Sequence, residues 1–304
     1  MTAAQAAWPE HTIRMIVGYP PGGGTDVLAR LLAQKLSESI GQPVVVENKA
    51  GAGGIVGASY VAQAPADGYT IIMITSNHTV PLDTKEKRPY DPLKSFTPIS
   101  AIAYLPSILV VNATLPVKTV KEFIDLAKTR PGKFNFGSTG PGTAQYMDMV
   151  LFGRAAGIDI VSVNYGGAAP ILVALLGDEI QVTSQPITAS LPQLQAGKVK
   201  ALAISGKSRS PLLPEVPTFQ EGGEPKGFVS TENWYGIVGP AGLPAPVVAR
   251  LHDELVKAVK GPQMQDALAQ QGFVTLASTA EAFAVTMSDD IVRWGSVISA
   301  VQGK

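Results

Sequence analysis

Two glycine-rich segments carry the residue types and spacing that point most directly to chemistry. Residues 18–26 (GYPPGGGTD) follow an apolar run and precede a helical pattern, and residues 137–145 (GSTGPGTAQ) form a second turn of the same kind. Glycines leave backbone N–H groups uncovered, and the following helix directs the positive end of its dipole at them. Residues 18–26 are therefore a candidate anion site, with a tight strand-to-helix turn of an α/β protein as the alternative.

Known nucleotide-binding and catalytic motifs fit the sequence poorly. A phosphate-binding loop requires Lys followed by Ser or Thr after its last glycine, whereas Thr25 and Asp26 follow Gly24. Residues 51–57 (GAGGIVG) place the last glycine of a dinucleotide fingerprint one residue late. No Gly-x-Ser-x-Gly motif is present, and Ser138 has no base nearby in the sequence. The sequence thus argues against nucleotide binding and against a serine hydrolase.

One histidine lies where a ligand could reach it. His78 belongs to the polar cluster 75–79 (TSNHT), beside Ser76 and Asn77, at the end of a predicted strand where ligand-facing residues collect. An enzyme acting on a small organic acid would use His78 as its base. No cluster of His, Asp and Glu has metal-ligand spacing, so neither a metal nor another cofactor is expected.

Three further residues have both a structural and a ligand-binding interpretation. Asp26 is favoured as a helix-capping residue, because a carboxylate beside an anion site would repel the ligand unless it faces away or holds a water. Tyr19 lies in a turn, where its ring can wall a small pocket or pack in the core. Trp234 follows a long breaker-rich connection and can pack at a hinge or contact a ligand.

Charge and composition exclude several classes of protein. The 304 residues contain 24 Lys and Arg against 24 Asp and Glu, so no surface for nucleic acid or an anionic membrane is expected. The absence of cysteine excludes disulfides and thiol catalysis. No apolar run reaches the roughly 18 residues of a membrane span. Residues 1–7 (MTAAQAA) resemble the surroundings of a signal-peptidase site, so we expect a mature domain whose signal peptide is absent.

The elements that must position these residues alternate between strands and helices. Strands are predicted at 13–17, 43–46, 69–74, 133–136, 160–165, 179–184, 199–205, 235–238 and 273–276, with a surface connection at 85–98. A long C-terminal helix is predicted to begin with Ser278 as N-cap and Glu281 three residues on, a capping box.

This pattern predicts an α/β protein with doubly wound sheets in two lobes. Residues 8–103 plus 229–304 are assigned to lobe 1 and residues 104–228 to lobe 2. Paired crossings between such lobes create a hinge cleft, and ligands of α/β proteins bind at the carboxyl ends of the strands.

Motifs along nearly the whole chain strongly resemble the Bug (TctC-like) family of solute-binding proteins. They occur in family order at residues 13–26, 46–54 (VENKAGAGG), 66–70 (ADGYT), 90–92 (YDP), 137–143, 212–218 and 239–242 (GPAG). The resemblance implies a periplasmic, two-lobed receptor with the type II-like Venus flytrap fold, acting as a monomer. Such a receptor hands small carboxylates to the membrane subunits of a tripartite tricarboxylate transporter. The resemblance also implies that loops 19–26 and 138–145 hold carboxylates through backbone amides and ordered water.

The distribution of charged residues agrees with this resemblance and narrows the class of ligand that is expected. Neither glycine-rich loop contains Lys or Arg, so helix dipoles and the hydroxyls of Ser138, Thr139 and Thr143 would neutralise a bound carboxylate. Two such loops suit a ligand that is anionic at both ends. A dicarboxylate is therefore the leading expectation, and aromatic acids also fit.

Two departures from the family pattern bear on specificity. After Tyr165 the family often has Lys or Arg, whereas this chain has Gly166, which removes a cation and opens space for a bulkier ligand. Members that bind amino acids tend to have an aspartate where this chain has Gln185, and a neutral amide cannot compensate a buried ammonium. We therefore predict a ligand without an amino group. The predicted ligand-binding residues are Tyr19, Gly22, Gly23, Gly24, Thr25, Asp26, Ser76, Asn77, His78, Ser138, Thr139, Thr143, Gln145, Tyr165, Gly166, Gln185 and Trp234.

Overall fold

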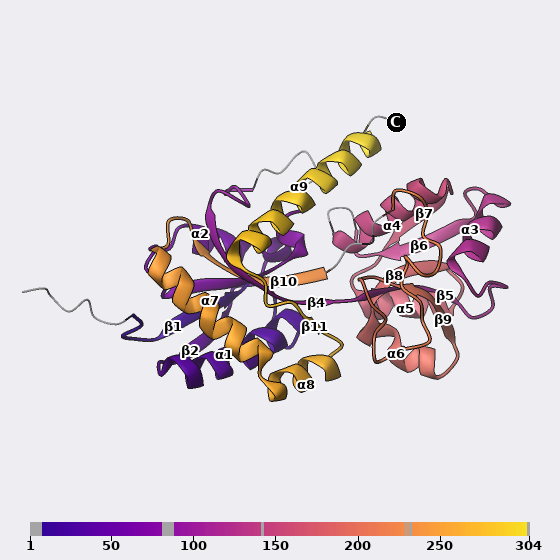
Figure 1. Ribbon diagram of the computed structural model, residues 1–304. Coiled ribbons are helices and arrows are strands. Elements are labelled where there is room, and N and C mark those ends of the chain that lie inside the picture. Colours follow the sequence, from indigo (N-terminus) through magenta and orange to yellow (C-terminus); the bar gives the residue numbers. More distant parts are fainter. Residues whose placement is uncertain (1–7, 81–87, 141–142, 229, 231–232, 303–304) are drawn as a thin grey trace, which may run out of the picture. The chain divides into compact units, whose positions relative to one another are not determined.

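The structure is a computed structural model that describes residues 8–80, 88–140, 143–228, 230 and 233–302. The chain forms two compact units (Figure 1). Unit 1 contains the described residues up to Tyr104, together with Trp234–Gln270 and Val274–Arg293. Unit 2 contains Leu105–Asn233, Gln271–Phe273 and the described residues from Trp294 onward. Each unit is built on one mixed sheet with helices, which confirms the predicted α/β class.

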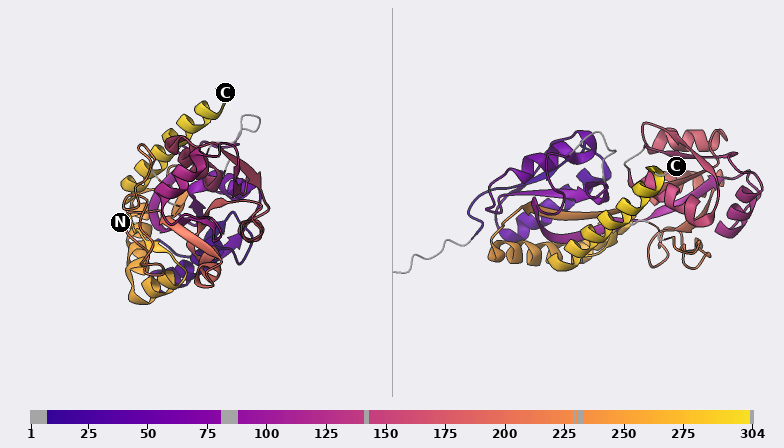
Figure 2. Two further views of the ribbon diagram at one scale, coloured as in Figure 1. Left: turned by 90° about the vertical axis from the view of Figure 1, so that its right-hand side faces the viewer. Right: turned by 90° about the horizontal axis from the view of Figure 1, so that it is seen from above.

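Unit 1 is built on a six-stranded sheet with the order β11-β4-β10-β3-β1-β2. Its strands are β1 (Ile13–Val17), β2 (Val44–Asn48), β3 (Thr70–Thr75), β4 (Phe96–Leu105), β10 (Asn233–Pro240) and β11 (Val274–Thr275). Its helices are α1 (Gly24–Ile40), α2 (Ile55–Ala62), α7 (Ala245–Lys260) and α8 (Pro262–Gln270), with short 3-10 turns η1 (Ala52–Gly54) and η2 (Ser76–His78). The helix α9 (Ala280–Gln302) belongs to unit 1 up to Arg293. The long helix α9 is uninterrupted, as both views of Figure 2 show.

Unit 2 is built on a five-stranded sheet with the order β7-β6-β8-β5-β9. Its strands are β5 (Ser107–Asn112), β6 (Phe134–Ser138), β7 (Ile160–Asn164), β8 (Val182–Pro186) and β9 (Val199–Ile204). Its helices are α3 (Val120–Lys128), α4 (Ala144–Ala156), α5 (Ala168–Leu176) and α6 (Ile187–Gln195).

The two sheets share one local plan. In unit 1, β1 pairs in parallel with β2 on one side and β3 on the other. In unit 2, β6 pairs in parallel with β7 and β8 in the same way. In both units a helix follows the central strand and another follows the edge strand. Parallel strands of this kind are buried on both faces, which explains why all six residues of β3 are buried.

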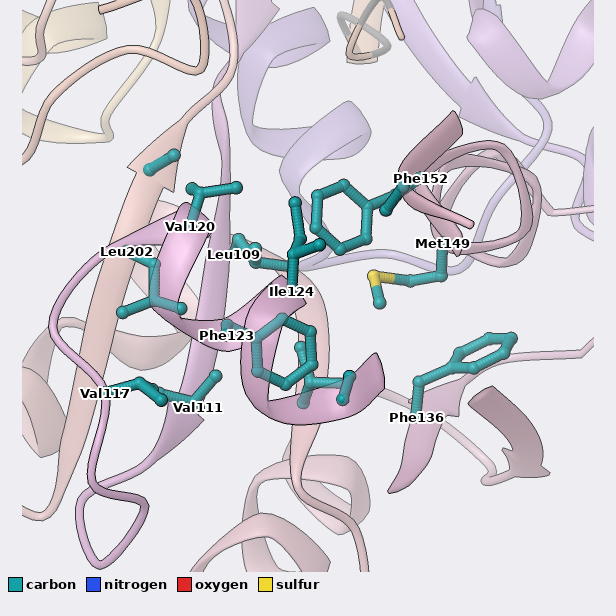
Figure 3. Packing of buried hydrophobic residues seen from close by; sticks show 14 of the residues in the cluster. Leu109, Val111, Val117, Val120, Phe123, Ile124, Phe136, Met149, Phe152 and Leu202 are labelled. Atoms are coloured by element: carbon teal, nitrogen blue, oxygen red, sulfur yellow. The ribbon is translucent and has the colours of Figure 1, made fainter. Parts of the chain in front are cut away.

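The core of unit 2 is rich in aromatic rings. Phe123 of α3 packs edge-on against Phe134, with ring centroids 5.8 Å apart, and Phe152 of α4 packs edge-on against Phe228 at 5.4 Å. Figure 3 shows how Phe123, Phe152 and Phe136 converge with aliphatic side chains from β5 and α3. Such pairs add about 0.5–1.5 kcal/mol each beyond the buried area. This packing fixes α3 and α4 on one face of the sheet.

The sequence interpretation is wrong about one strand. Residues 85–98 were expected to form a surface connection, and 88–95 do form one. Residues 96–98, however, belong to β4, which is buried over most of its ten residues. Residues 81–87 lie outside the described part of the chain. The interior of this strand contains Pro98 and little alternation between apolar and polar residues, so it lacks the pattern of a half-exposed strand.

Candidate functional site

The carboxyl ends of the parallel strands bring separate segments together in each unit. In unit 1 the ends of β1, β2 and β3 lie side by side, because Val17 pairs with Asn48 and with Met73. We call residues 18–23, 49–54 and 76–78, which follow these strands, the unit 1 edge. In unit 2 the register Ser138–Asn164 brings the ends of β6 and β7 together in the same way. We call residues 138–140, 143, 165–167 and 185 the unit 2 edge.

The first glycine-rich segment leads directly into a long helix. The helix α1 begins at Gly24, and Gly23 is its N-cap with extended backbone and no side-chain cap. Thr25 and Asp26 complete the first turn. The positive end of a 17-residue helix is therefore presented at the unit 1 edge without a capping side chain.

Backbone packing explains why this segment and the next are both glycine-rich. A Cβ atom on Gly18 would lie 2.8 Å from the Cα of Gly54, and one on Gly57 would lie 2.9 Å from the Cα of Gly18. The start of α2 therefore packs directly on the backbone of the first loop. A side chain at either position would push the two segments apart.

Tyr19 ties the segments of the unit 1 edge together through its hydroxyl. This oxygen donates to the carbonyl of Gly53 at 3.0 Å and lies 2.9 Å from the Oγ1 of Thr75. One phenol thus links the loops that follow β1 and β2 to the end of β3. From the sequence, Tyr19 was expected either to wall a pocket or to pack in the core. The structure adds a third role, because its hydroxyl links the loops to each other.

The carboxylate of Asp26 is bonded to three groups of unit 1. Its carboxylate accepts from the N–H of Gly22 at 2.9 Å and from the Nδ2 of Asn48 at 2.8 Å, and it pairs with the Nε of Arg30 at 2.9 Å. The bond to Arg30 has the largest effect, and together the bonds lower the pKa of Asp26 to about 2. They outweigh the effect of burial, which raises the pKa of this residue, only 3% exposed. Asp26 reaches back from the third position of α1 to the N–H of Gly22, one residue before the N-cap Gly23. It therefore has a structural role at the start of the helix without being its side-chain cap.

Asn48 is a candidate site residue that the sequence interpretation did not include. Its amide donates to the carbonyl of Tyr19 at 3.0 Å as well as to Asp26. Asn48 ends β2, so the general rule that polar residues collect at carboxyl ends of strands would have indicated it.

The side chain of His78 is buried within unit 1. Its Nε2 lies 3.0 Å from the carbonyl of Pro92, and its ring stacks on Tyr90 and meets the edge of Phe96. Burial lowers the pKa of His78 to about 4, so the ring is neutral near pH 7. Ser76 is also buried, and the backbone N–H of Asn77 donates to the Oγ1 of Thr75. The imidazole therefore packs with aromatic rings, an environment that suits a core residue.

Trp234 is a core residue of unit 1. It is 2% exposed, its Nε1 donates to Asp290 at 2.6 Å, and its ring packs edge-on against Phe283. Of the two interpretations left open by the sequence, packing is the one that these contacts support.

The unit 2 edge contains hydroxyl groups beside a helix N-terminus. Thr143 is the N-cap of α4, and its Oγ1 accepts from the N–H of Tyr146. Ser138 is fully buried, and its Oγ accepts from the N–H of Gly140 at 3.2 Å and lies 3.2 Å from Asn164. Thr139 is exposed and bonds weakly to Gln145. Residues 141–142 of the predicted loop lie outside the described residues.

Two other helices begin at the unit 2 edge without a side-chain cap. The N-cap of α5 is Gly167, two residues after Tyr165, and the N-cap of α6 is Pro186. A Cβ on Gly166 would meet no atom within 4 Å, so the glycine does leave open space. The N-termini of α4, α5 and α6 thus follow three strands whose ends are adjacent.

Gln185 has the most unusual environment at this edge. The residue is 1% exposed, yet neither its Nε2 nor its Oε1 has a hydrogen-bond partner in the described part of the chain. Buried polar groups are usually paired, and leaving one unpaired costs roughly 1–3 kcal/mol. An unpaired amide in this position is therefore available to a bound molecule.

The described residues contain neither a candidate metal cluster nor a candidate membrane-spanning helix. No group of three or more His, Cys, Asp or Glu side chains is placed to hold a metal ion there. Over the same ranges, no helix combines the length and the apolar character needed to cross a membrane.

Two α/β units of this plan define a class of protein, the two-lobed periplasmic solute-binding proteins, to which the structural neighbours belong. A family model described as the tripartite tricarboxylate transporter family receptor, TctC, matches residues 28–302. The chain belongs to this family, which includes the Bug proteins. It is therefore a solute-binding receptor rather than an enzyme, and the resemblance seen in the sequence is confirmed.

Three relatives illustrate the similarity. BugT of Bordetella pertussis is 34% identical over 299 residues, which cover 98% of this chain and 91% of BugT. An R. palustris protein solved with adipate is 33% identical, with a TM-score of 0.81 over 96% of this chain and 97% of its own. MatC from Rhodopseudomonas palustris with bound malate is 30% identical, with a TM-score of 0.76 over 96% of this chain and all of its own.

Proposed function

We propose that this protein is a periplasmic receptor for a small organic carboxylate without an amino group, with a dicarboxylate as the leading ligand class and an aromatic acid as the next. One observation carries the proposal. Each unit presents a helix with a glycine N-cap and no side-chain cap, α1 in unit 1 and α5 in unit 2, at the ends of adjacent parallel strands. A dicarboxylate carries two groups of the charge that such helix N-termini stabilise.

The electrostatics of the edges support an anionic ligand. Each helix N-terminus is equivalent to roughly half a positive charge, and its electrostatic effect falls off within the first turn. Asp26, in the first turn of α1, is paired with Arg30, which offsets its negative charge. Related proteins have been solved with adipate and with malate, which are both dicarboxylates.

Gln185 supports the exclusion of amino acids. Its amide is buried and unpaired, and it can donate or accept a hydrogen bond but cannot neutralise an ammonium group. Burying an ammonium against a neutral amide would leave a charge without compensation, which is strongly unfavourable. A hydroxyl or carboxylate oxygen of the ligand would instead satisfy the amide. The open space at Gly166 favours a ligand larger than a simple four-carbon acid.

The family also suggests a location and partners. Because tripartite tricarboxylate transporter receptors work with a membrane component, we propose that the protein delivers its ligand to the membrane subunits of such a transporter. In this role the receptor would act in the periplasm as a monomer. Size-exclusion chromatography with light scattering would show one chain of 31.7 kDa if the monomer proposal is right.

The ligand class is tested by calorimetry on the purified protein. The panel contains adipate, malate and benzoate on one side and aspartate and glutamate on the other. We expect binding to at least one acid of the first group and none to the amino acids. Tight binding of aspartate or glutamate without binding of the simple acids would contradict the proposal. The variant Gln185→Asp should weaken binding of the simple acids, because it places a second negative charge at the unit 2 edge.

A further inference from the structure

Arg88 differs from the paired arginines of this chain in the partners of its guanidinium group. Arg14 pairs with Glu47 and Arg30 pairs with Asp26. The guanidinium of Arg88 donates instead to backbone carbonyls, those of Asn77 at 3.0 Å, His78 and Val80. Among the described residues, no carboxylate forms an ion pair with it.

The environment of Arg88 makes this charge costly. Its side chain is partly buried, and its Nε is buried with no hydrogen-bond partner in the described part of the chain. Burial lowers the pKa of Arg88, but an arginine stays protonated in proteins because its pKa lies so far above neutrality. A positive charge withdrawn from water needs compensation by an opposite charge. Carbonyl dipoles supply only part of it.

Arg88 lies at the unit 1 edge. The carbonyls of Asn77 and His78 that it binds belong to η2, which directly follows β3. The guanidinium also interacts electrostatically with Tyr19, whose hydroxyl contacts Thr75. His78 is buried and packs with Tyr90 and Phe96, so its neutral ring adds no charge there.

We propose that Arg88 is the counter-charge for a carboxylate bound at the unit 1 edge, and that it positions η2 through its bonds to the carbonyls of Asn77 and His78. This inference rests on the proposed function, because it concerns the same ligand. It changes the account of how the anion is neutralised. The helix dipole of α1 supplies about half a charge, and Arg88, which comes from a distant part of the sequence, supplies a full one.

The test separates charge from structure with three variants. Arg88→Gln removes the charge and keeps hydrogen-bond donors, whereas Arg88→Lys keeps the charge with a different donor geometry. Arg14→Gln is the matched control, because Arg14 is a unit 1 arginine already paired with Glu47. Calorimetry measures binding of adipate and of adipate monoamide, in which one carboxylate is replaced by a neutral group, at low and high salt.

We expect Arg88→Gln to weaken adipate binding by about tenfold or more and to reduce the preference for adipate over the monoamide by a similar factor. Arg88→Lys should retain most of that preference, and Arg14→Gln should stay within twofold of the wild type. Equal losses for both ligands, or equal losses in both Arg88 variants, would mean a purely structural role and overturn the inference. If Arg88→Gln leaves adipate binding intact, the inference about Arg88 is wrong and the proposed function still stands. A wild-type protein that binds no acid of the panel would overturn the proposed function together with it.

Discussion

At the scale of single residues, the side chains that look reactive in the sequence are mostly held by their neighbours. Asp26 bonds to Gly22, Asn48 and Arg30, and His78 packs between Tyr90 and Phe96. The segments that contain these residues could be predicted from glycine spacing and strand ends. Their partners could not be predicted. Pro92 reaches His78 only through the fold, and the pairing of Arg30 with Asp26 depends on side-chain rotamers that no motif specifies.

The buried His78 leads to a prediction about pH. Its pKa is lowered to about 4 in the folded protein, below its value of about 6.5 in the unfolded chain. Between these values the unfolded chain binds a proton that the folded protein does not, so stability falls as the pH is lowered from 6.5 to 4. A shift of this size corresponds to at most about 3 kcal/mol, at 1.36 kcal/mol per pKa unit.

Urea unfolding of the wild type and of His78→Gln at several pH values measures this effect. We expect the variant to lack the decline between pH 6.5 and 4 that His78 causes. Phe96→Leu is the matched control, because it disturbs the same aromatic cluster but keeps the titrating ring. It should lower stability by a similar amount at every pH. Parallel curves for the wild type and His78→Gln would contradict the prediction.

At the scale of elements, the order of most strands and helices could be predicted from hydrophobic patterns. The exact start of α9 and the strand β4 could not. The N-cap predicted at Ser278 lies one residue later, because the Oγ1 of Thr279 accepts from the N–H of Ala282. Glu281 is then the second residue of α9 and not the third, so the predicted capping box does not form. Ser278 instead accepts from the N–H of Ala101, in β4. Strand β4 was itself missed, so its contact with Ser278 could not have been anticipated.

Two glycines inside helices give opposite predictions. Replacing a helical glycine by alanine normally stabilises a helix by about 0.5–1 kcal/mol. In α9, a Cβ on Gly295 would meet no atom within 4 Å, so Gly295→Ala should follow this rule. In α2, a Cβ on Gly57 would lie 2.9 Å from the backbone of Gly18, so Gly57→Ala should destabilise by about 1 kcal/mol or more.

The same pair of variants connects packing to binding. Because Gly18 begins the first glycine-rich loop, Gly57→Ala should also weaken binding of the carboxylate ligand, whereas Gly295→Ala should leave the affinity unchanged. Urea unfolding and calorimetry on both variants provide the measurements. A stabilising effect of Gly57→Ala would show that the backbones of α2 and the first loop are not in the close contact described above.

At the scale of the whole molecule, the α/β class and the family could be read from ordered motifs along the chain. Both units repeat one plan, in which β2-β1-β3 and β7-β6-β8 end beside helix N-termini. Sequence motifs indicate this plan because glycine turns and strand patterns involve residues that are close together in the sequence. Among the described residues, the amide of Gln185 has no hydrogen-bond partner and Arg88 has no carboxylate partner. Both features depend on contacts made in the fold, so no local sequence pattern indicates them.

A receptor that binds its ligand only when folded should gain stability from it in a quantitative way. The gain is RT ln(1 + [L]/Kd), about 2.7 kcal/mol at a ligand concentration 100 times Kd. We therefore expect the melting temperature to rise with the logarithm of ligand concentration above Kd, with a slope that agrees with the calorimetric Kd. A hydrolase or isomerase would instead consume the ligand during the experiment. Recovering the acid unchanged after prolonged incubation, at one molecule per chain, would agree with a receptor, and a melting temperature that stays constant at saturating ligand would contradict binding to the folded protein.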